Sequence, residues 1–382
     1  MSLRVAVKPE LVRWACERSG RDLDALTERF EKLPLWLSGQ AQPTLKQLED
    51  LAKATYTPFG YFFLPAPLEE RVPIPDFRTM AGKVAGRPSP NLLDMIYICQ
   101  QRQDWYRDFA RSMGDRPLPF VGAAKLGDDV VETARKIRAA LGFSLEAHWK
   151  ASTWSDALRS FIACADDAGM LVMCSGVVLN NNSRKLDPEE FRGFALSDPL
   201  APLVFVNGSD TKGAQMFTLA HELAHVWLGS SGVSDPVAGR EPDQDEERWC
   251  NRVAAELLVP LEVLRSELNP RNPLVAEIQR LSRRFKVSTL VILRRIHDAG
   301  ALSWDALWDA YEAELARLLA LPSGSGGNFH LTTAARVSKR FARALVISTW
   351  EGRSSFTEAF SLLGIKKVET FRGLSDSLGM AI

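Results

Sequence analysis

The residues with the clearest chemical potential are two histidines and a glutamate in FTLAHELAHVWLG, residues 217–229. His221, Glu222 and His225 have the spacing His-Glu-x-x-His. On a helix, residues four positions apart lie on one face, with Cβ atoms about 5–6 Å apart. Two imidazoles at that spacing can bind one zinc ion, each at about 2.0–2.1 Å. Zinc lowers the pKa of a bound water, and Glu222 is placed to take a proton from that water as it attacks a peptide carbonyl.

The alternative interpretation is that both histidines are satisfied core residues and that Glu222 lies on the surface. The motif is short, but the chain contains only five histidines. A chance match is therefore expected in about 1 in 100 such sequences or fewer. The surrounding helix is strongly apolar, and burying these polar side chains in it costs several kcal/mol unless they bind something. The pattern therefore favours a metal site.

A catalytic zinc site normally has three protein ligands, and the next predicted helix offers two candidates for the third. Glu246 and Glu247 open the segment QDEERWCNRVAAELLVP. Glu247 shares a helix face with Asn251, and we favour it as the ligand over Glu246. Either glutamate could instead be a stabilising acid in the first turn of a helix. The remaining histidines, which are distant in sequence and lie in unrelated contexts, are His148, His297 and His330.

The elements around these residues must bring the two helices together. Apolar periodicity predicts one helix over Lys212–Leu228 and a second over about Asp245–Leu258. Strand-like runs rich in β-branched and aromatic residues precede them at 170–179, 191–197 and 202–208. This alternation predicts a small mixed α+β peptidase domain over about residues 91–270.

The flanking regions are predicted to be helical. Residues 1–65 predict a helix-turn-helix-like bundle, and residues 66–90 are a Pro/Gly-rich connector. Residues 271–321 predict a basic helical extension, and residues 330–382 a small helical C-terminal region. Between them, PSGSGGN at 322–328 is expected to be a flexible break. The expected fold class is therefore α+β, mostly helical.

Composition narrows the classes of function. A chain of 382 residues is long enough for two or three domains, and its formal net charge is zero. The whole molecule therefore lacks the basic excess typical of nucleic-acid-binding proteins. The five cysteines are odd in number and widely spaced, which disfavours a disulfide framework or a structural zinc ribbon. No apolar run has membrane-spanning length and the N-terminus has no signal-peptide core, so we expect a cytoplasmic protein without a membrane partner.

Taken together, the two helices resemble the ImmA/IrrE family of zinc metallopeptidases. That family pairs a Phe-Thr-x-Ala-His-Glu-x-x-His helix with a second helix that reads Glu-x-x-x-Asn, then Ala-Ala, and ends in Leu-Leu-x-Pro. The matching residues of the first helix are Phe217, Thr218, Ala220, His221, Glu222 and His225. Those of the second helix are Glu247, Asn251, Ala254, Ala255, Leu257, Leu258 and Pro260. In this register the resemblance selects Glu247 as the third ligand.

The resemblance extends to the flanks of the chain. Residues 1–65 are similar to a Cro/repressor-type helix-turn-helix segment, and a Pro-Asp-Phe-Arg connector follows at residues 75–78. The resemblance implies a zincin-like peptidase domain with a short sheet and bound Zn2+. It also implies a bacterial or phage regulator whose substrate is a protein, such as a repressor or a toxin-system partner. Cys250 departs from the family pattern, in which a small residue is usual at that position.

The alternative function is a DNA-binding transcription regulator or an antitoxin-like binding protein whose peptidase fold serves as a sensor or scaffold. Residues 1–65 hold nine basic and eight acidic residues, a weak footprint for phosphate. Leu35, Trp36 and Leu37 occupy the candidate recognition segment in place of polar base-reading residues. DNA binding and protein interaction are both open for this bundle. Residues 280–295, with six basic and no acidic residues, predict either a nucleic-acid surface or a solvated basic face over the peptidase core.

Overall fold

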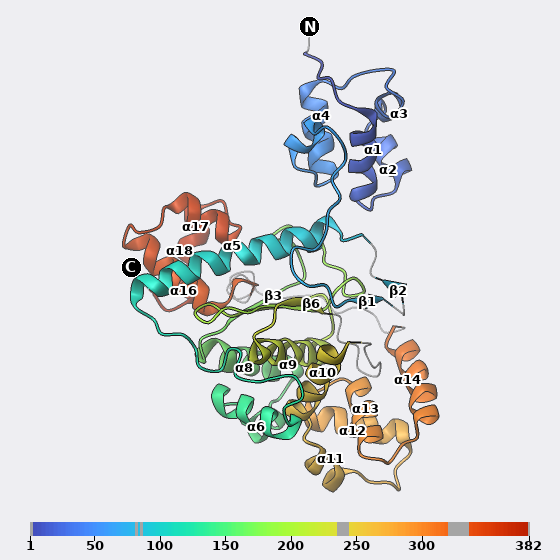
Figure 1. Ribbon diagram of the computed structural model, residues 1–382, viewed down its shortest axis with the longest axis vertical. Helices are drawn as coiled ribbons and strands as arrows, with labels where there is room; N and C mark the ends of the chain where they lie inside the picture. The colour runs from blue at the N-terminus through green and yellow to red at the C-terminus, as the bar shows by residue number, and fades with distance from the viewer. Residues whose placement is uncertain (1–2, 81–82, 85–86, 235–243, 320–335, 381–382) are drawn as a thin grey trace. The chain divides into compact units, whose positions relative to one another are not determined.

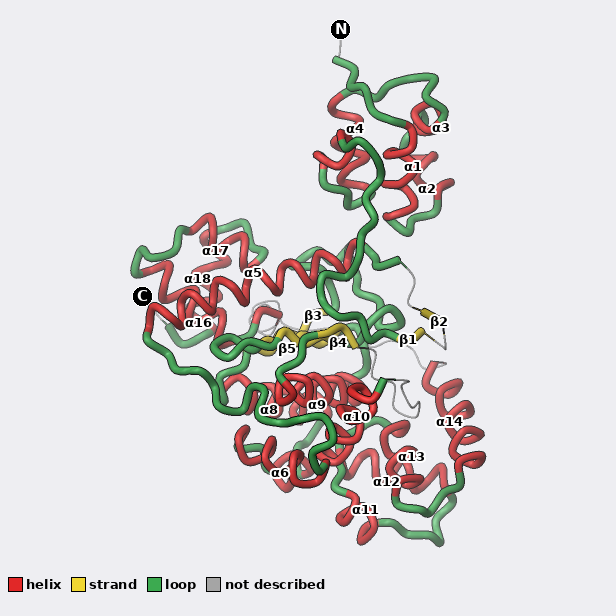
Figure 2. Tube along the Cα trace, in the orientation of Figure 1, coloured by secondary structure: helices red, strands yellow, loops and turns green. Residues whose placement is uncertain are grey.

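The chain is mostly helical and contains one four-stranded sheet, which confirms the predicted α+β class (Figures 1 and 2). The computed structural model describes residues 3–80, 83–84, 87–234, 244–319 and 336–380. Two compact units are present: Met1–Pro73 with Ala85–Ile96, and Ile74–Val84 with Tyr97–Ile382. The finer domain limits expected from the sequence stay predictions.

The N-terminal unit is a bundle of short helices around its own core. Its elements are α1 (Pro9–Arg18), α2 (Leu23–Arg29), α3 (Leu33–Leu37), α4 (Leu45–Ala54) and the 3-10 helix η1 (Phe59–Phe63). Helix α4 begins with a capping box, in which Thr44 and Gln47 satisfy each other's backbone N–H groups. Trp36 of the candidate recognition segment is buried in the core, whereas Leu35 beside it is exposed. A DNA-reading helix-turn-helix in this bundle stays a prediction.

The second unit is built on a mixed sheet with the strand order β3-β5-β4-β6. The strands are β3 (Leu171–Ser175), β4 (Gly193–Leu196), β5 (Leu203–Asn207) and β6 (Gly232–Ser234). Strands β3 and β5 are parallel, and β4 is antiparallel to both of its neighbours, β5 and β6. Each predicted strand-like run contains one strand, but β6 has no counterpart among them. A separate two-stranded ribbon joins β1 (Thr79–Met80) and β2 (Lys83–Val84).

Helices cover both faces of this sheet (Figure 2). Helix α5 (Pro90–Met113) runs along one face, where Gln103 donates hydrogen bonds to the carbonyls of Leu196 and Ala201. The opposite face carries α8 (Trp154–Asp167) and α9 (Lys212–Leu228), with α6 (Val130–Leu141) and α10 (Asp245–Leu258) packed behind them. The short helix α7 (Leu145–Trp149) precedes α8. The main apolar core of the unit lies between the sheet and these helices.

Helix α9 begins and ends where its sequence predicts. The hydroxyl of Thr211 accepts a hydrogen bond from the Ala214 N–H, which caps the first turn. Gly229 follows the last turn with φ +74°, the left-handed conformation that glycine adopts without strain. These two local signals fix the length of the helix that carries the histidines.

The described residues from 261 onward form helices joined by short loops. Its elements are α11 (Leu261–Glu267), α12 (Leu274–Phe285), α13 (Thr289–Asp298), α14 (Trp304–Leu319), α16 (Lys339–Trp350), α17 (Phe356–Leu363) and α18 (Val368–Ser377). The hydroxyl of Ser288 caps α13 by accepting a hydrogen bond from the Val291 N–H. The expected break at 322–328 lies outside the described residues. Among the helices that the structure describes, none is long and apolar enough to cross a membrane.

Candidate metal centre

Helices α9 and α10 pack against each other and bring the sequence-predicted residues together. His221, Glu222 and His225 on α9 are fully buried, and Glu247 in the first turn of α10 is 3% exposed. The apolar sequence of α9 explains this burial, because the helix is enclosed by β4 and β5 on one side and by α8 and α10 on others.

The three predicted ligands face one another. The Nε2 atoms of His221 and His225 lie 3.0 Å apart. One carboxylate oxygen of Glu247 lies 2.9 Å from Nε2 of His225, and the other lies 3.3 Å from Nε2 of His221. Within the described part of the chain, this is the one group of three such side chains close enough to share a metal ion.

The donor set fits zinc. Two nitrogen ligands of a tetrahedral zinc ion lie about 3.3 Å apart when each bond is about 2.0–2.1 Å. The observed separation of 3.0 Å between the two Nε2 atoms needs only a small adjustment to reach that value. Two imidazoles and one carboxylate leave a fourth position for water or substrate, as in catalytic zinc sites. The residues present could therefore hold Zn2+, and their role as ligands stays a prediction.

A second layer of polar groups orients both imidazoles. Nδ1 of His221 lies 2.9 Å from Oδ1 of Asn251, and Nδ1 of His225 lies 3.0 Å from the Ser230 hydroxyl. Nδ1 of His225 is also 3.1 Å from a carboxylate oxygen of Glu246. When each imidazole donates its Nδ1–H to one of these acceptors, its Nε2 atom carries no proton. The Nε2 lone pair is then free and faces Glu247. Glu247 thus lies next to both Nε2 atoms, whereas Glu246 lies next to Nδ1 of His225.

The sheet closes the centre from the other side. The Ser234 hydroxyl of β6 lies 3.4 Å from both Nε2 of His225 and Oε1 of Glu247. Gly193 of β4 lies directly against α9: a Cβ atom there would be 3.0 Å from Oε1 of Glu222 and 2.6 Å from Cγ2 of Thr218. Sequence reasoning did not identify Ser230, Ser234 or Gly193. Ser234 and Gly193 reach the centre only through tertiary contact, whereas Ser230 contacts His225 locally, just beyond the end of α9.

The carboxyl group of Glu222 is fully buried. Neither of its oxygens makes a hydrogen bond within the described residues. Burial raises the pKa of Glu222 to about 8, although His225 opposes the shift. Glu247 behaves differently, because His221 and His225 hold its pKa well below the usual range even though burial alone would raise it. Burial alone therefore favours the protonated form of Glu222, whereas the two histidines favour the ionised form of Glu247. The positive charge of a bound Zn2+ would lower the pKa of Glu222 and favour the carboxylate that a general base requires.

The remaining described histidines lie elsewhere, whereas the thiol of Cys250 lies beside His225. His148 bonds to the Phe285 carbonyl at 3.1 Å, and His297 to the Leu302 carbonyl at 2.8 Å, so neither joins the cluster. His330 lies outside the described residues. The thiol of Cys250 is fully buried, and this burial raises its pKa to about 11. Within the described residues, the metal-binding candidates are therefore confined to α9 and α10.

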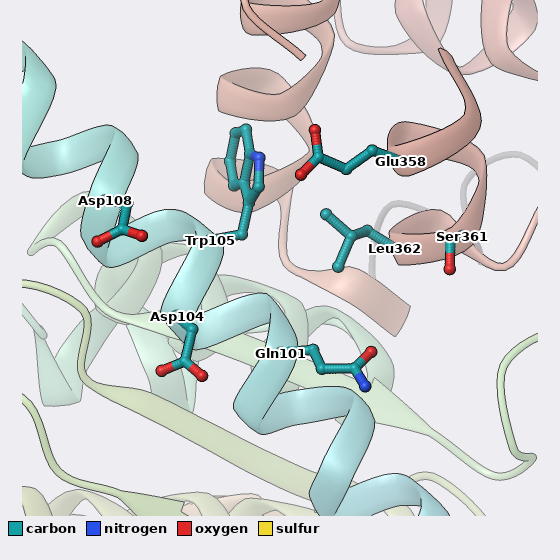
Figure 3. A pocket seen from close by; sticks show the side chains of 7 residues that line it. All are labelled: Gln101, Asp104, Trp105, Asp108, Glu358, Ser361 and Leu362. Carbon is teal, nitrogen blue, oxygen red and sulfur yellow. The ribbon is translucent and has the colours of Figure 1, made fainter. Parts of the chain in front are cut away.

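A concave site with a volume of about 440 Å³ lies between α5 and α17, away from the candidate metal centre (Figure 3). It is lined by Gln101, Asp104, Trp105, Asp108, Glu358, Ser361 and Leu362. Asp104 pairs with Arg107 at 2.7 Å and Asp108 with Arg111 at 3.4 Å, both on their own helix. The lining contains no imidazole or thiol. The cavity therefore does not offer a catalytic set comparable to the one between α9 and α10.

Comparison with known proteins supports a metallopeptidase-type domain. Residues 165–297 match the model of the IrrE N-terminal-like domain, a peptidase family, and this range includes α9 and α10. Residues 337–377 match a domain of unknown function.

Two curated relatives carry the description radiation response metalloprotease IrrE. The protein of Deinococcus radiodurans is 32% identical over 96 residues, covering 24% of this chain and 29% of that relative. The protein of Deinococcus deserti is 34% identical over 96 residues, covering 24% of this chain and 34% of that relative. The similarity therefore spans about a third of each relative or less. It supports the expected ImmA/IrrE resemblance for the peptidase domain.

Proposed function

We propose that this protein is a zinc-dependent endopeptidase. In this proposal His221, His225 and Glu247 hold Zn2+, and Glu222 is the general base. One observation carries it: three donors converge from two helices beside a buried glutamate whose oxygens make no hydrogen bond in the described residues. A buried polar group without a partner costs free energy, and such groups concentrate at functional sites.

The proposed reaction is hydrolysis of a peptide bond, with two proton transfers through Glu222. When bound, zinc would polarise the scissile carbonyl and increase the acidity of the attacking water. Glu222 would take a proton from that water as the water oxygen bonds to the carbonyl carbon. The same carboxyl group would then pass the proton to the amine nitrogen as the C–N bond breaks. Asn251 and Ser230 would hold the imidazoles in place throughout.

We further propose a regulatory role. The relatives are named as radiation response metalloproteases, and the similarity covers the part of the chain that contains the candidate centre. By extension, this chain would act in bacteria or phages by cleaving a partner protein, such as a repressor or a toxin-system partner.

DNA binding is the weaker alternative for the basic segment 280–295. Arg295 is buried and paired with Glu256 and the Val259 carbonyl. Arg280 pairs with Glu277 at 2.7 Å, and other cations of the segment also have acidic partners. Four of the six cations in this segment, Arg280, Arg284, Arg294 and Arg295, are thus already paired with acidic groups of the same unit. This pairing favours a basic face that covers the peptidase core and weakens the case for a phosphate-binding surface.

The test combines metal content with proteolysis. Purified full-length protein should contain about one zinc per chain, and it should cleave the product of a neighbouring gene in its genome. Cleavage should stop when a chelator removes the metal and return when zinc is added back. A protein that holds no zinc under any loading condition, or whose cleavage is indifferent to the chelator, would refute the proposal.

A further inference from the structure

The connector segment at residues 75–78 adds a short piece of strand to the sheet beside the metal centre. The N–H of Phe77 donates to the Val233 carbonyl at 2.9 Å, and the N–H of Val233 donates to the Pro75 carbonyl at 2.9 Å. Asp76 forms a parallel bridge with Val233. Strand β6 pairs with β4 along its other edge, so the connector covers the edge of β6 that would otherwise be open.

An ion pair between the buried Arg78 and the more exposed Asp76 fixes this segment on both sides of Phe77. The guanidinium of Arg78 donates to both carboxylate oxygens of Asp76, at 2.8 and 2.7 Å. It also lies 3.5 Å from a carboxylate oxygen of Glu190. The Arg78 side chain is only 2% exposed, so solvent does not loosen the fork-shaped contact. The backbone at Phe77 is therefore held by the sheet and by this clamp.

The ring of Phe77 lies on the face of a predicted zinc ligand. Its plane is 7° from that of His225, with the ring centroids 5.7 Å apart. Gly232 makes this approach possible, because a Cβ atom there would lie 2.3 Å from Cε2 of Phe77. Ser230 and Glu246 hold the imidazole from its edge, at Nδ1. Phe77 instead contacts a face of the same imidazole, which the in-plane contacts of Ser230 and Glu246 do not cover.

We propose that Phe77 is a positioning residue of the metal centre. The connector segment would thereby help to orient a zinc ligand of the peptidase. The stacked ring would restrict tilting of the His225 imidazole and keep Nε2 directed toward His221 and Glu247. This inference rests on the proposed function, since it assumes that His225 binds zinc. Aromatic contacts with specific geometry add stabilisation beyond the area they bury, and outer-shell partners commonly tune metal affinity.

Full-length variants test this role through metal binding, independently of activity. Phe77→Leu keeps an apolar side chain but removes the flat ring, and Phe77→Tyr keeps the ring. Ile74→Ala is the matched control, because it truncates a half-buried side chain of the same connector. Zinc affinity would be measured by chelator competition, the visible spectrum after Co2+ loading would report ligand geometry, and thermal unfolding would report stability.

Phe77→Leu should weaken zinc binding by about 10-fold and change the Co2+ spectrum, whereas Phe77→Tyr and Ile74→Ala should resemble the parent protein. Unchanged affinity and spectrum in Phe77→Leu would overturn the inference. The inference would also be overturned if Phe77→Leu bound zinc as the parent does but cleaved its substrate faster, because the connector would then inhibit the site. If Phe77→Leu does not fold, Phe77→Met replaces it as the variant without a flat ring, and unchanged affinity and spectrum in Phe77→Met would overturn the inference. A parent protein that binds no zinc would instead refute the proposed function.

Discussion

Nδ1 of His221 lies 2.9 Å from Oδ1 of Asn251, one helical turn beyond Glu247 on the same helix. Helix α10 thus supplies both the candidate carboxylate ligand and the amide that orients the imidazole opposite it. The amide oxygen can only accept a hydrogen bond, so it favours the tautomer in which Nε2 is free to bind a metal. The Glu-x-x-x-Asn spacing therefore has a physical reason.

Removing this amide should weaken metal binding. We expect Asn251→Ala to reduce zinc affinity about 10- to 100-fold, because the His221 imidazole loses the partner that fixes its orientation. Affinity would be measured by competition with a chromophoric chelator. Arg252→Ala, an exposed change at the next position of α10, is the control and should leave affinity unchanged. Equal affinity in both variants would show that Asn251 does not orient the ligand.

The two adjacent glutamates should differ in their effect on metal content. Glu247→Gln should lower zinc affinity far more than Glu246→Gln, because Glu247 faces both Nε2 atoms while Glu246 contacts only Nδ1 of His225. The double variant His221→Ala, His225→Ala should hold no stoichiometric zinc. Elemental analysis of the purified variants would check this. A larger loss in Glu246→Gln would reverse the assignment.

The bounds of α9 and the pairing of its two histidines could be predicted because they depend on residues close together in the sequence. Thr211 and Gly229 are a strong cap and a strong terminator, so the bounds of α9 follow from the residues beside them. His221 and His225 share a face because helix geometry alone requires it. Choosing Glu247 over Glu246 needed more, since the helix face shared with Asn251 only favoured Glu247 and the family register selected it.

The rest of the site depends on tertiary packing. Strand β6 has three residues, too few to show a period-two pattern, and it exists because β4 lies beside it. Ser234 and Phe77 reach His225 only through that strand. Gly193 leaves no trace in the local sequence, although the contact between β4 and α9 allows no side chain there. Their contributions to the site depend on contacts that form only in the folded chain.

His148 should make stability depend on pH. Burial lowers its pKa to about 4 from 6.5, Lys286 adds to the shift, and the hydrogen bond to Phe285 opposes it. In the unfolded chain His148 takes up a proton below about pH 6.5, whereas in the folded chain it does so only near pH 4. Lowering the pH through this window therefore favours unfolding, by up to about 3 kcal/mol.

The matched variant is His148→Gln, which can still donate to the Phe285 carbonyl but does not titrate. Urea unfolding from pH 7 to pH 4 should show a smaller loss of stability in this variant than in the parent. The comparison between the two proteins is needed because burial raises the pKa of Asp166 to about 6, which shifts stability in the opposite direction in both. Identical pH profiles would contradict the prediction.

The mechanism makes its sharpest prediction at Glu222. Its carboxylate is fully buried and makes no hydrogen bond in the described residues, so Glu222→Gln keeps its size without removing a structural contact that the fold needs. The amide cannot accept a proton from water. Zinc content and thermal stability should therefore stay close to those of the parent, while cleavage of the partner protein falls by about 100-fold or more. Asp245→Asn, an exposed change on α10, is the control and should keep full activity. If Glu222→Gln binds zinc and still exerts its full regulatory effect in cells, proteolysis is not how the protein works, and the sensor or scaffold role becomes the better description.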